Sequence, residues 1–71
     1  MEVIEFQAES IKLKDLLKVL NLLPTGGLAK AVIKEEGVIL NGQPCYIAGK
    51  KLSKGDEIIF DDYKIIITDV D

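Results

Sequence analysis

Residues 25–42 read TGGLAKAVIKEEGVILNG and contain a helix together with the signals that begin and end it. Thr25 is a good N-cap, because its hydroxyl can accept a hydrogen bond from a backbone N–H of the first turn. Gly37 suits the left-handed position that closes a helix. The apolar stripe between them consists of Leu28, Ala29, Val32 and Ile33. This pattern predicts a helix over about 25–36.

The sequence after this helix has the shorter period of β-strands. Asn41-Gly42 is a strong signal for a two-residue hairpin turn, and Pro44 in the return strand favours an edge position. A second turn, Lys54-Gly55-Asp56, precedes EIIF at 57–60, and YKIIIT follows at 63–68. We predict that these last two segments form an antiparallel pair.

The sequence before residue 25 predicts a strand and another helix. Residues 2–7, EVIEFQ, are rich in β-forming side chains. Leucines at helical spacing predict a helix over about 11–22, with Ser10 as its cap and Pro24 as the residue that stops it. These leucines are Leu13, Leu16, Leu17, Leu20 and Leu23. The order of elements predicts one α+β domain over 1–71, in which an N-terminal strand and two helices accompany a small antiparallel sheet of three to five short strands.

The composition of the 71 residues excludes several classes of protein. Apolar residues make up 48% and charged residues 30%, a balance that favours a folded chain. The chain has no histidine and one cysteine, Cys45, which rules out His-based catalysis, intrachain disulfides and cysteine-cluster metal sites. Neither GxGxxG nor the P-loop pattern occurs. We therefore expect no enzyme activity and no cofactor.

The sequence carries no signal for a membrane or for export. No apolar run approaches the roughly 20 residues that a membrane span requires. The N-terminal MEVIEF lacks the basic region and the apolar core of a signal peptide. We expect a soluble, cytoplasmic protein with no membrane partner and no small-molecule substrate.

Charges are segregated along the chain, although the net charge is only −3. Residues 1–9 carry three acids and no base, which gives −3, and residues 55–71 carry six acids against one lysine, which gives −5. Residues 10–54 carry eight lysines against three acids, which gives +5. A basic segment that also contains both predicted helices favours an anionic partner such as nucleic acid.

Lysines on the second helix are the main binding candidates. Lys30 and Lys34 lie one turn apart, opposite the apolar stripe, and neither has an acid three or four residues away within the helix. The helix N-terminus at Thr25, Gly26 and Gly27 offers free N–H groups and a partial positive charge, which suit a phosphate. Solvated lysines and a plain helix cap are the simpler interpretation of the same residues.

Lysines on the first helix and in the loop before residue 55 are further candidates. They are Lys14, Lys18, Lys50, Lys51 and Lys54. The pair on the first helix is the weaker signal, because Asp15 can pair with Lys18. The loop and the second helix are both poor in acids, so we expect them to form one basic surface.

Aromatic side chains that could stack on bases are few. Phe6, Phe60 and Tyr63 are expected in the core, whereas Tyr46 follows the hairpin and is expected to be exposed. Recognition would then depend on phosphates and on RNA shape, with little readout of bases.

Acids near the C-terminus raise the alternative of a metal site. They are Asp56, Glu57, Asp61 and Asp62. Carboxylates suit Mg²⁺ and Ca²⁺, but aspartate is also favoured in tight turns, and the set lacks the ligand spacing of a calcium loop. We expect turn chemistry here and no metal site.

Four motifs in order resemble the S-four (S4) domain, the RNA-binding fold of ribosomal small-subunit protein four, also called the αL motif. The resemblance covers residues 11–60 and is to the short stand-alone bacterial members. The matching segments are the leucine-rich helix from Leu13 to Leu20, Thr25-Gly26-Gly27-Leu28-Ala29-Lys30, Gly37-Val38-Ile39-Leu40-Asn41-Gly42, and Lys51-Leu52 followed by Gly55-Asp56-Glu57-Ile58. Each motif is weak alone, but four at family-like spacing are specific.

The resemblance implies that the two helices and the hairpin present a basic surface to structured RNA, commonly ribosomal or transfer RNA. Carried over by position, the implied contacts are Thr25, Gly26, Gly27 and Lys30 at the second helix, and Lys50 and Lys51 after the hairpin. The chain has no arginine, and Ile47-Ala48 stand where short members commonly have an arginine pair. Because lysine acts on phosphate as a point charge, without the bidentate fork of arginine, we expect weaker and more salt-sensitive binding.

The same departure supports an alternative function. An apolar patch of Leu22, Tyr46, Ile47 and Ala48 would suit a protein partner in place of RNA. A ubiquitin-like carrier is a third option, which the C-terminal ITDVD disfavours because it lacks Gly-Gly. The leading expectation is a monomeric RNA-binding module.

Overall fold

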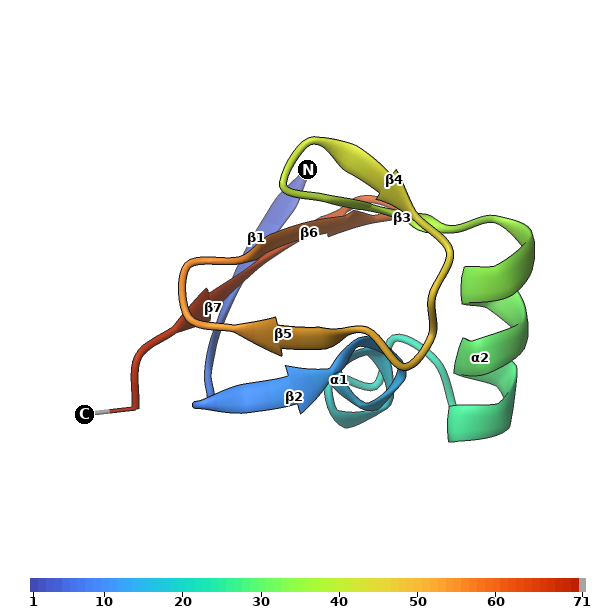
Figure 1. Cartoon of the computed structure of the whole chain (residues 1–71), viewed down its shortest axis with the longest axis horizontal. Helices are drawn as coiled ribbons and strands as arrows, with labels where there is room; N and C mark the ends of the chain where they lie inside the picture. The colour runs from blue at the N-terminus through green and yellow to red at the C-terminus, as the bar shows by residue number, and fades with distance from the viewer. Residues whose placement is uncertain (71) are drawn as a thin grey trace.

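The computed structural model describes residues 1–70, and over these residues it has the α+β architecture that the sequence predicts. Two helices and a sheet form separate layers, with α1 beneath the sheet and α2 at one end of it (Figure 1). The elements are β1 (Glu2–Gln7), β2 (Ser10–Lys12), α1 (Leu13–Val19), α2 (Gly26–Glu35), β3 (Val38–Leu40), β4 (Gln43–Cys45), β5 (Lys51–Ser53), β6 (Glu57–Phe60) and β7 (Tyr63–Thr68).

The main sheet has five strands in the order β1-β7-β6-β3-β4. It is antiparallel from β7 to β4, and the predicted pair of β6 and β7 is confirmed. The N-terminal strand β1 pairs in parallel with β7, so the sheet is mixed at this edge. A second, two-stranded sheet joins β2 to β5 in antiparallel fashion. The chain therefore brings β1, from its acidic N-terminal segment, next to β7, which carries Lys64 and no acid.

The predicted signals around α2 are confirmed. The Thr25 Oγ1 accepts a hydrogen bond from the Leu28 N–H at 3.0 Å, which is the expected N-cap. The helix ends at Glu35, and Gly37 follows in the left-handed region with φ +74°. A β-carbon at Gly37 would lie 2.7 Å from Cε1 of Tyr46, so this position is glycine for two reasons, its backbone angle and the aromatic ring above it.

The start of the first helix differs from the prediction. The helix begins at Leu13 and not at residue 11, and Ser10 is not its cap, because residues 10–12 form strand β2. The first N–H groups of α1 donate instead to carbonyls of the loop before β5. The Leu13 N–H reaches the Lys50 oxygen at 2.9 Å, and the Lys14 N–H reaches the Ala48 oxygen at 3.1 Å. A distant segment therefore supplies the cap.

The end of α1 also differs, because the helix stops at Val19 and Pro24 does not terminate it. Asn21 takes the left-handed conformation with φ 60°. Its N–H bonds the Lys18 oxygen at 3.0 Å, and the Leu22 N–H bonds the Leu17 oxygen at 3.0 Å. These two bonds are those of a Schellman motif with asparagine at the left-handed position.

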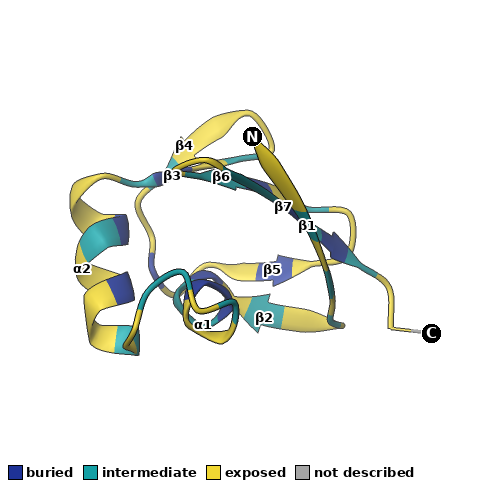
Figure 2. Ribbon diagram, turned by 180° about the vertical axis from the view of Figure 1, so that it is seen from behind, coloured by how far each residue is buried: buried dark blue, intermediate teal, exposed yellow. Residues whose placement is uncertain are grey.

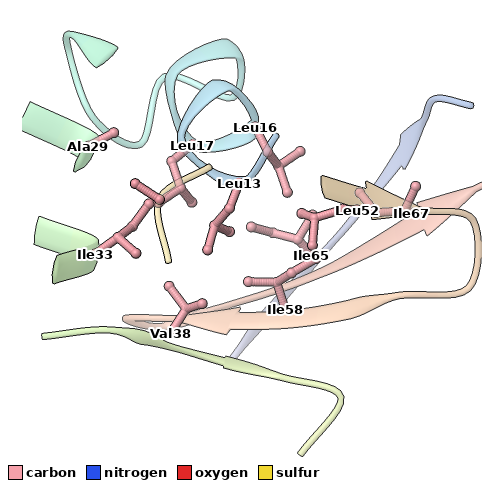
Figure 3. Packing of buried hydrophobic residues seen from close by; sticks show 11 residues of the cluster. Leu13, Leu16, Leu17, Ala29, Ile33, Val38, Leu52, Ile58, Ile65 and Ile67 are labelled. Carbon is pink, nitrogen blue, oxygen red and sulfur yellow. The ribbon is translucent and has the colours of Figure 1, made fainter. Parts of the chain in front are cut away.

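The core lies between α1 and the inner face of the sheet. Leucines of α1 point toward isoleucines of β6 and β7, and α2 closes one end (Figure 3). Buried residues lie on the sides of α1, α2 and β5 that face inward (Figure 2). The core residues are Leu13, Leu16, Leu17, Ala29, Ile33, Val38, Ala48, Leu52, Ile58, Ile65 and Ile67.

The predicted hairpin after α2 is confirmed. Asn41 and Gly42 have φ values of 50° and 84°, the signs of a type I′ turn, and they join β3 to β4. Pro44 lies in β4 at the edge of the sheet, as expected for a residue with no N–H to donate.

We predict that Gly37→Ala lowers the free energy of unfolding by about 1–2 kcal/mol through its left-handed backbone, with a further loss from the Tyr46 ring. Gly49→Ala is the matched control, because no heavy atom lies within 4 Å of a β-carbon there. Chemical denaturation checks both variants. In the background of Tyr46→Ala, only the backbone part of the Gly37→Ala loss should remain. An unchanged stability in Gly37→Ala would contradict the conformational argument.

Candidate nucleic-acid interface

One face of α2 carries the first group of predicted site residues. Lys30 and Lys34 are exposed, and together with Gly27 they line a shallow depression along the helix. The residues that complete its lining are Ala31 and Glu35. Neither lysine has an acid three or four residues away within the helix, yet Glu35 lines the same depression in the structure. This face is therefore less basic than the sequence suggested.

The N-terminus of α2 opens onto the same face. The Thr25 hydroxyl satisfies the Leu28 N–H, and the Thr25 carbonyl accepts from the Ala29 N–H at 3.0 Å. Among residues 1–70, no acceptor is bonded to the N–H of Gly26 or Gly27. A β-carbon at either glycine would meet no heavy atom within 4 Å. These two N–H groups therefore have no partner among residues 1–70, and Lys30 follows one turn further along the helix.

A second basic group forms where β2 meets β5. Lys12 and Lys51 are direct cross-strand partners in this pair, and both are exposed. Like charges in this position disfavour the pairing, so a bound anion would stabilise it. Lys12 was missed as a candidate because residues 11–12 were assigned to a helix. The signal was present in the sequence, since Ser-Ile-Lys at 10–12 and Lys-Leu-Ser at 51–53 both alternate polar with apolar residues.

Backbone hydrogen bonds hold Lys14 and Lys50 at the same place. The Lys14 N–H donates to the Ala48 carbonyl at 3.1 Å, and the Lys50 N–H donates to the Ile47 carbonyl at 3.1 Å, which makes the segment 47–50 a tight turn. Lys50 and Lys51 both line a depression whose other residues are Leu40, Asn41, Gln43, Ser53 and Asp56. The loop therefore gathers lysines from two separate parts of the sequence, residues 12–14 and residues 50–51.

The two basic groups occupy different depressions. The depression on α2 and the depression beside Lys50 and Lys51 share no lining residue. The segment between β4 and β5 connects them, since it runs from the end of α2 to the start of α1 (Figure 1). At its beginning the Tyr46 ring lies against Gly37.

Ion pairs leave most of the candidate lysines unneutralised. Within residues 1–70 two lysines are in ion pairs, Lys54 with Asp69 at 3.3 Å and Lys64 with Glu57 at 3.1 Å. The pair that the sequence allowed between Asp15 and Lys18 does not form among these residues. Lys54 is the one predicted contact that already has a carboxylate partner. The lysines outside these pairs are Lys12, Lys14, Lys18, Lys30, Lys34, Lys50 and Lys51.

Asp56, one of the acids near the C-terminus, has a structural role. The Asp56 carboxylate accepts from the Ser53 N–H at 2.9 Å and from the Asn41 side-chain amide at 3.0 Å. The Asn41 side-chain oxygen in turn accepts from the Glu57 N–H at 2.9 Å. These bonds connect the hairpin turn to the turn between β5 and β6. Over residues 1–70, no three side chains of the metal-binding types lie close enough to hold an ion.

The apolar patch predicted for a protein partner is not present as a single surface. Tyr46 and Ile47 are exposed, as the sequence suggested for the tyrosine, with 53% and 64% of their area accessible. Ala48 is buried in the core and Leu22 packs against it, so neither belongs to an exposed patch. Phe6 and Phe60 pack on the core as expected, while Tyr63 is half-buried.

Two helices, a five-stranded mixed sheet and a type I′ hairpin define a small α+β domain. The family model of the S4 domain matches residues 4–68, and the chain belongs to this family of RNA-binding domains. The prediction made from the four motifs is thereby confirmed. A probable ribosome maturation protein of Bacillus subtilis, RlbA, is 34% identical to the chain over 55 residues, which cover 78% of each protein. No helix within residues 1–70 has the length and apolar character needed to cross a membrane.

Asp56→Ala should lower the free energy of unfolding by about 1–2 kcal/mol, because it leaves the Ser53 N–H and the Asn41 amide without their acceptor. Asp62→Ala serves as the control, since it removes the same charge from another exposed turn. Urea denaturation measures both. The losses for Asp56→Ala and Asn41→Gly should not add in the double variant, and full additivity would show that the two side chains act independently.

Proposed function

We propose that this protein binds structured RNA, mainly through phosphates and RNA shape, by way of its unpaired lysines. The observation that carries this proposal is the set of seven lysines with no ion pair within residues 1–70, all of them in α1, α2, β2, β5 and the loop before β5. Such lysines are free to replace the counterions of an RNA backbone. Ordinary surface lysines would more often be accompanied by nearby acids in a protein of net charge −3.

The two depressions have complementary roles in this proposal. At α2, the free N–H groups of Gly26 and Gly27 bind one phosphate, and Lys30 and Lys34 bind phosphates along the helix. At the second site Lys50 and Lys51 contact another part of the RNA, assisted by Lys12 across the strand pair. Two separated contact points favour an RNA whose backbone has a defined three-dimensional shape.

Ribosomal RNA is the RNA class that we propose. The support is the similarity to the Bacillus subtilis protein named as a probable ribosome maturation protein, together with a site that contains few groups for reading bases. Transfer RNA offers the same phosphate chemistry and serves as the comparison in binding experiments. Protein-only docking through Tyr46 and Ile47 is the less favoured alternative, because the exposed apolar area there consists of two side chains.

The salt dependence of RNA binding tests which lysines contact phosphates. In a titration of a labelled ribosomal RNA fragment, Lys30→Ala and Lys51→Ala should each weaken binding and flatten the slope of log K against log salt by about 1. Lys64→Ala is the matched control, because it removes the same charge from a lysine that is paired with Glu57. Equal slopes in all three variants, or no binding by the wild type, would overturn the proposal.

Arginine substitutions at two neighbouring positions after the hairpin should have different effects. Ile47 is exposed, so Ile47→Arg should keep the fold, raise RNA affinity and steepen the salt slope by about 1. Ala48 is buried, so Ala48→Arg should cost several kcal/mol of stability. RNA titration and thermal unfolding of the two variants measure these effects. An unchanged RNA affinity in Ile47→Arg would show that the RNA does not contact the segment after the hairpin.

A further inference from the structure

The two edges of the main sheet are protected to different degrees. Strand β4 is three residues long and contains Pro44, so it offers little backbone for another strand to pair with. Strand β1 is six residues long and contains no proline and no lysine. Within residues 1–70 its single neighbour in the sheet is β7. The edge at β1 is therefore longer and less protected than the edge at β4, and the charged residues that it carries are Glu2 and Glu5.

The free backbone groups of β1 can be assigned from its pairing. The Glu2 N–H donates to the Asp62 oxygen at 2.8 Å, and the Ala8 N–H donates to the Thr68 oxygen at 3.2 Å. Alternate residues of a strand direct their N–H and C=O groups to opposite sides. Even-numbered residues therefore bond β7, whereas Val3, Glu5 and Gln7 direct their backbone groups away from the sheet.

The side chains of β1 indicate what kind of strand would fit this edge. Val3, Glu5 and Gln7 are exposed on the outer face, whereas Ile4 and Phe6 are half-buried and cover the side of the core. A strand added beside β1 would bring one set of its side chains next to Glu5 and the other set over Ile4 and Phe6. Basic residues suit the first set and apolar residues the second.

Charge distinguishes among the occupants of this edge. Residues 1–9 have a charge of −3 and no lysine, so an RNA backbone is repelled. Pairing of β1 with β1 of a second copy would bring the glutamates of two strands together, which is also unfavourable. A basic polypeptide is attracted by the same charges, so it is the occupant that the charge of this edge favours. None of the lysines proposed to bind RNA is in β1.

We propose that β1 is a docking edge for an extended segment of another protein in which basic and apolar residues alternate. The segment adds as a sixth strand of the main sheet and pairs with the outward backbone groups of Val3, Glu5 and Gln7. The protein then has two separate binding surfaces, a basic one on the helices and an acidic one at the sheet edge.

The test uses an eight-residue peptide, Lys-Val-Lys-Val-Lys-Val-Lys-Val, added to the isotopically labelled full chain. The expected result is a shift of the amide signals of Val3, Glu5 and Gln7, with slower hydrogen exchange at these three amides. The companion peptide with glutamate in place of lysine should cause no shift. Equal shifts with both peptides, or shifts confined to residues outside β1, would contradict the proposal.

Two variants separate the backbone contribution from the charge contribution. Val3→Pro removes an outward N–H that no group of the sheet uses, and it should weaken peptide binding about fivefold or more. Glu5→Lys reverses the charge and should abolish binding of the lysine peptide. Glu36→Lys has the same charge change on an exposed residue at the end of α2 and should leave peptide binding unchanged.

The dispersion of the amide signals of each variant provides the check that it remains folded, whether or not the wild type binds RNA. Val3→Pro and Glu5→Lys should retain the RNA affinity of the wild type or exceed it, because the lysine surface is untouched. The two proposals can therefore fail separately. Unchanged peptide affinity in both folded variants would overturn the docking edge, whatever the RNA result.

Discussion

The hydrogen bonds between the start of α1 and the loop before β5 are the constraint on which the rest of the structure depends. The carbonyls of Lys50 and Ala48 accept from the first two N–H groups of α1. They connect the helices to the strand layer at a point where α1 has no side-chain cap. The adjoining β2–β5 pair continues the same connection. Without it the lysines of the loop would not be held beside those of β2 and α1, because the loop is distant from β2 and α1 in the sequence.

The fold also converts a charge pattern in the sequence into a charge pattern in space. Strand β1 of the acidic N-terminal segment lies beside β7 of the C-terminal segment, whose acids lie outside β7 itself. The basic central segment forms both helices, β2 and β5. A net charge of −3 is therefore compatible with an RNA-binding surface, because residues 10–54 carry eight lysines against three acids. Surface lysines that have no acidic partner cost the protein little stability when they are solvated, and they raise its affinity for RNA when they contact a phosphate.

Features that depend on neighbouring residues could be predicted from the sequence. The Thr25 cap, the left-handed Gly37 and the Asn41-Gly42 turn each depend on the conformation of a few adjacent residues, and each is present in the structure. The turn at Gly55-Asp56 could be predicted as well. The hydrogen bond from the Asn41 side chain to the Asp56 carboxylate could not be predicted, because it joins two turns that are distant in sequence.

Features that depend on distant segments could not be predicted. Residues 10–12 have a helical spacing of leucines after them, yet they pair with β5 as a strand. The left-handed conformation of Asn21 ends α1 before Pro24. The leucines that follow Asn21 pack on the core from a loop and not from a helix. Lys12 was therefore overlooked, and Glu35 was not seen as a neighbour of the lysines on α2. Each of these errors concerns which residues lie together on one surface of the folded chain.

A chemical-shift map of the protein, recorded while a structured ribosomal RNA fragment is added, tests the central claim most directly. The account predicts that the backbone amide signals of Gly26, Gly27 and Lys30 on α2 move together with those of Lys50 and Lys51, while the signals of β1 and β7 stay in place. Saturable shifts confined to β1 and β7, or no shifts at low salt, would contradict it.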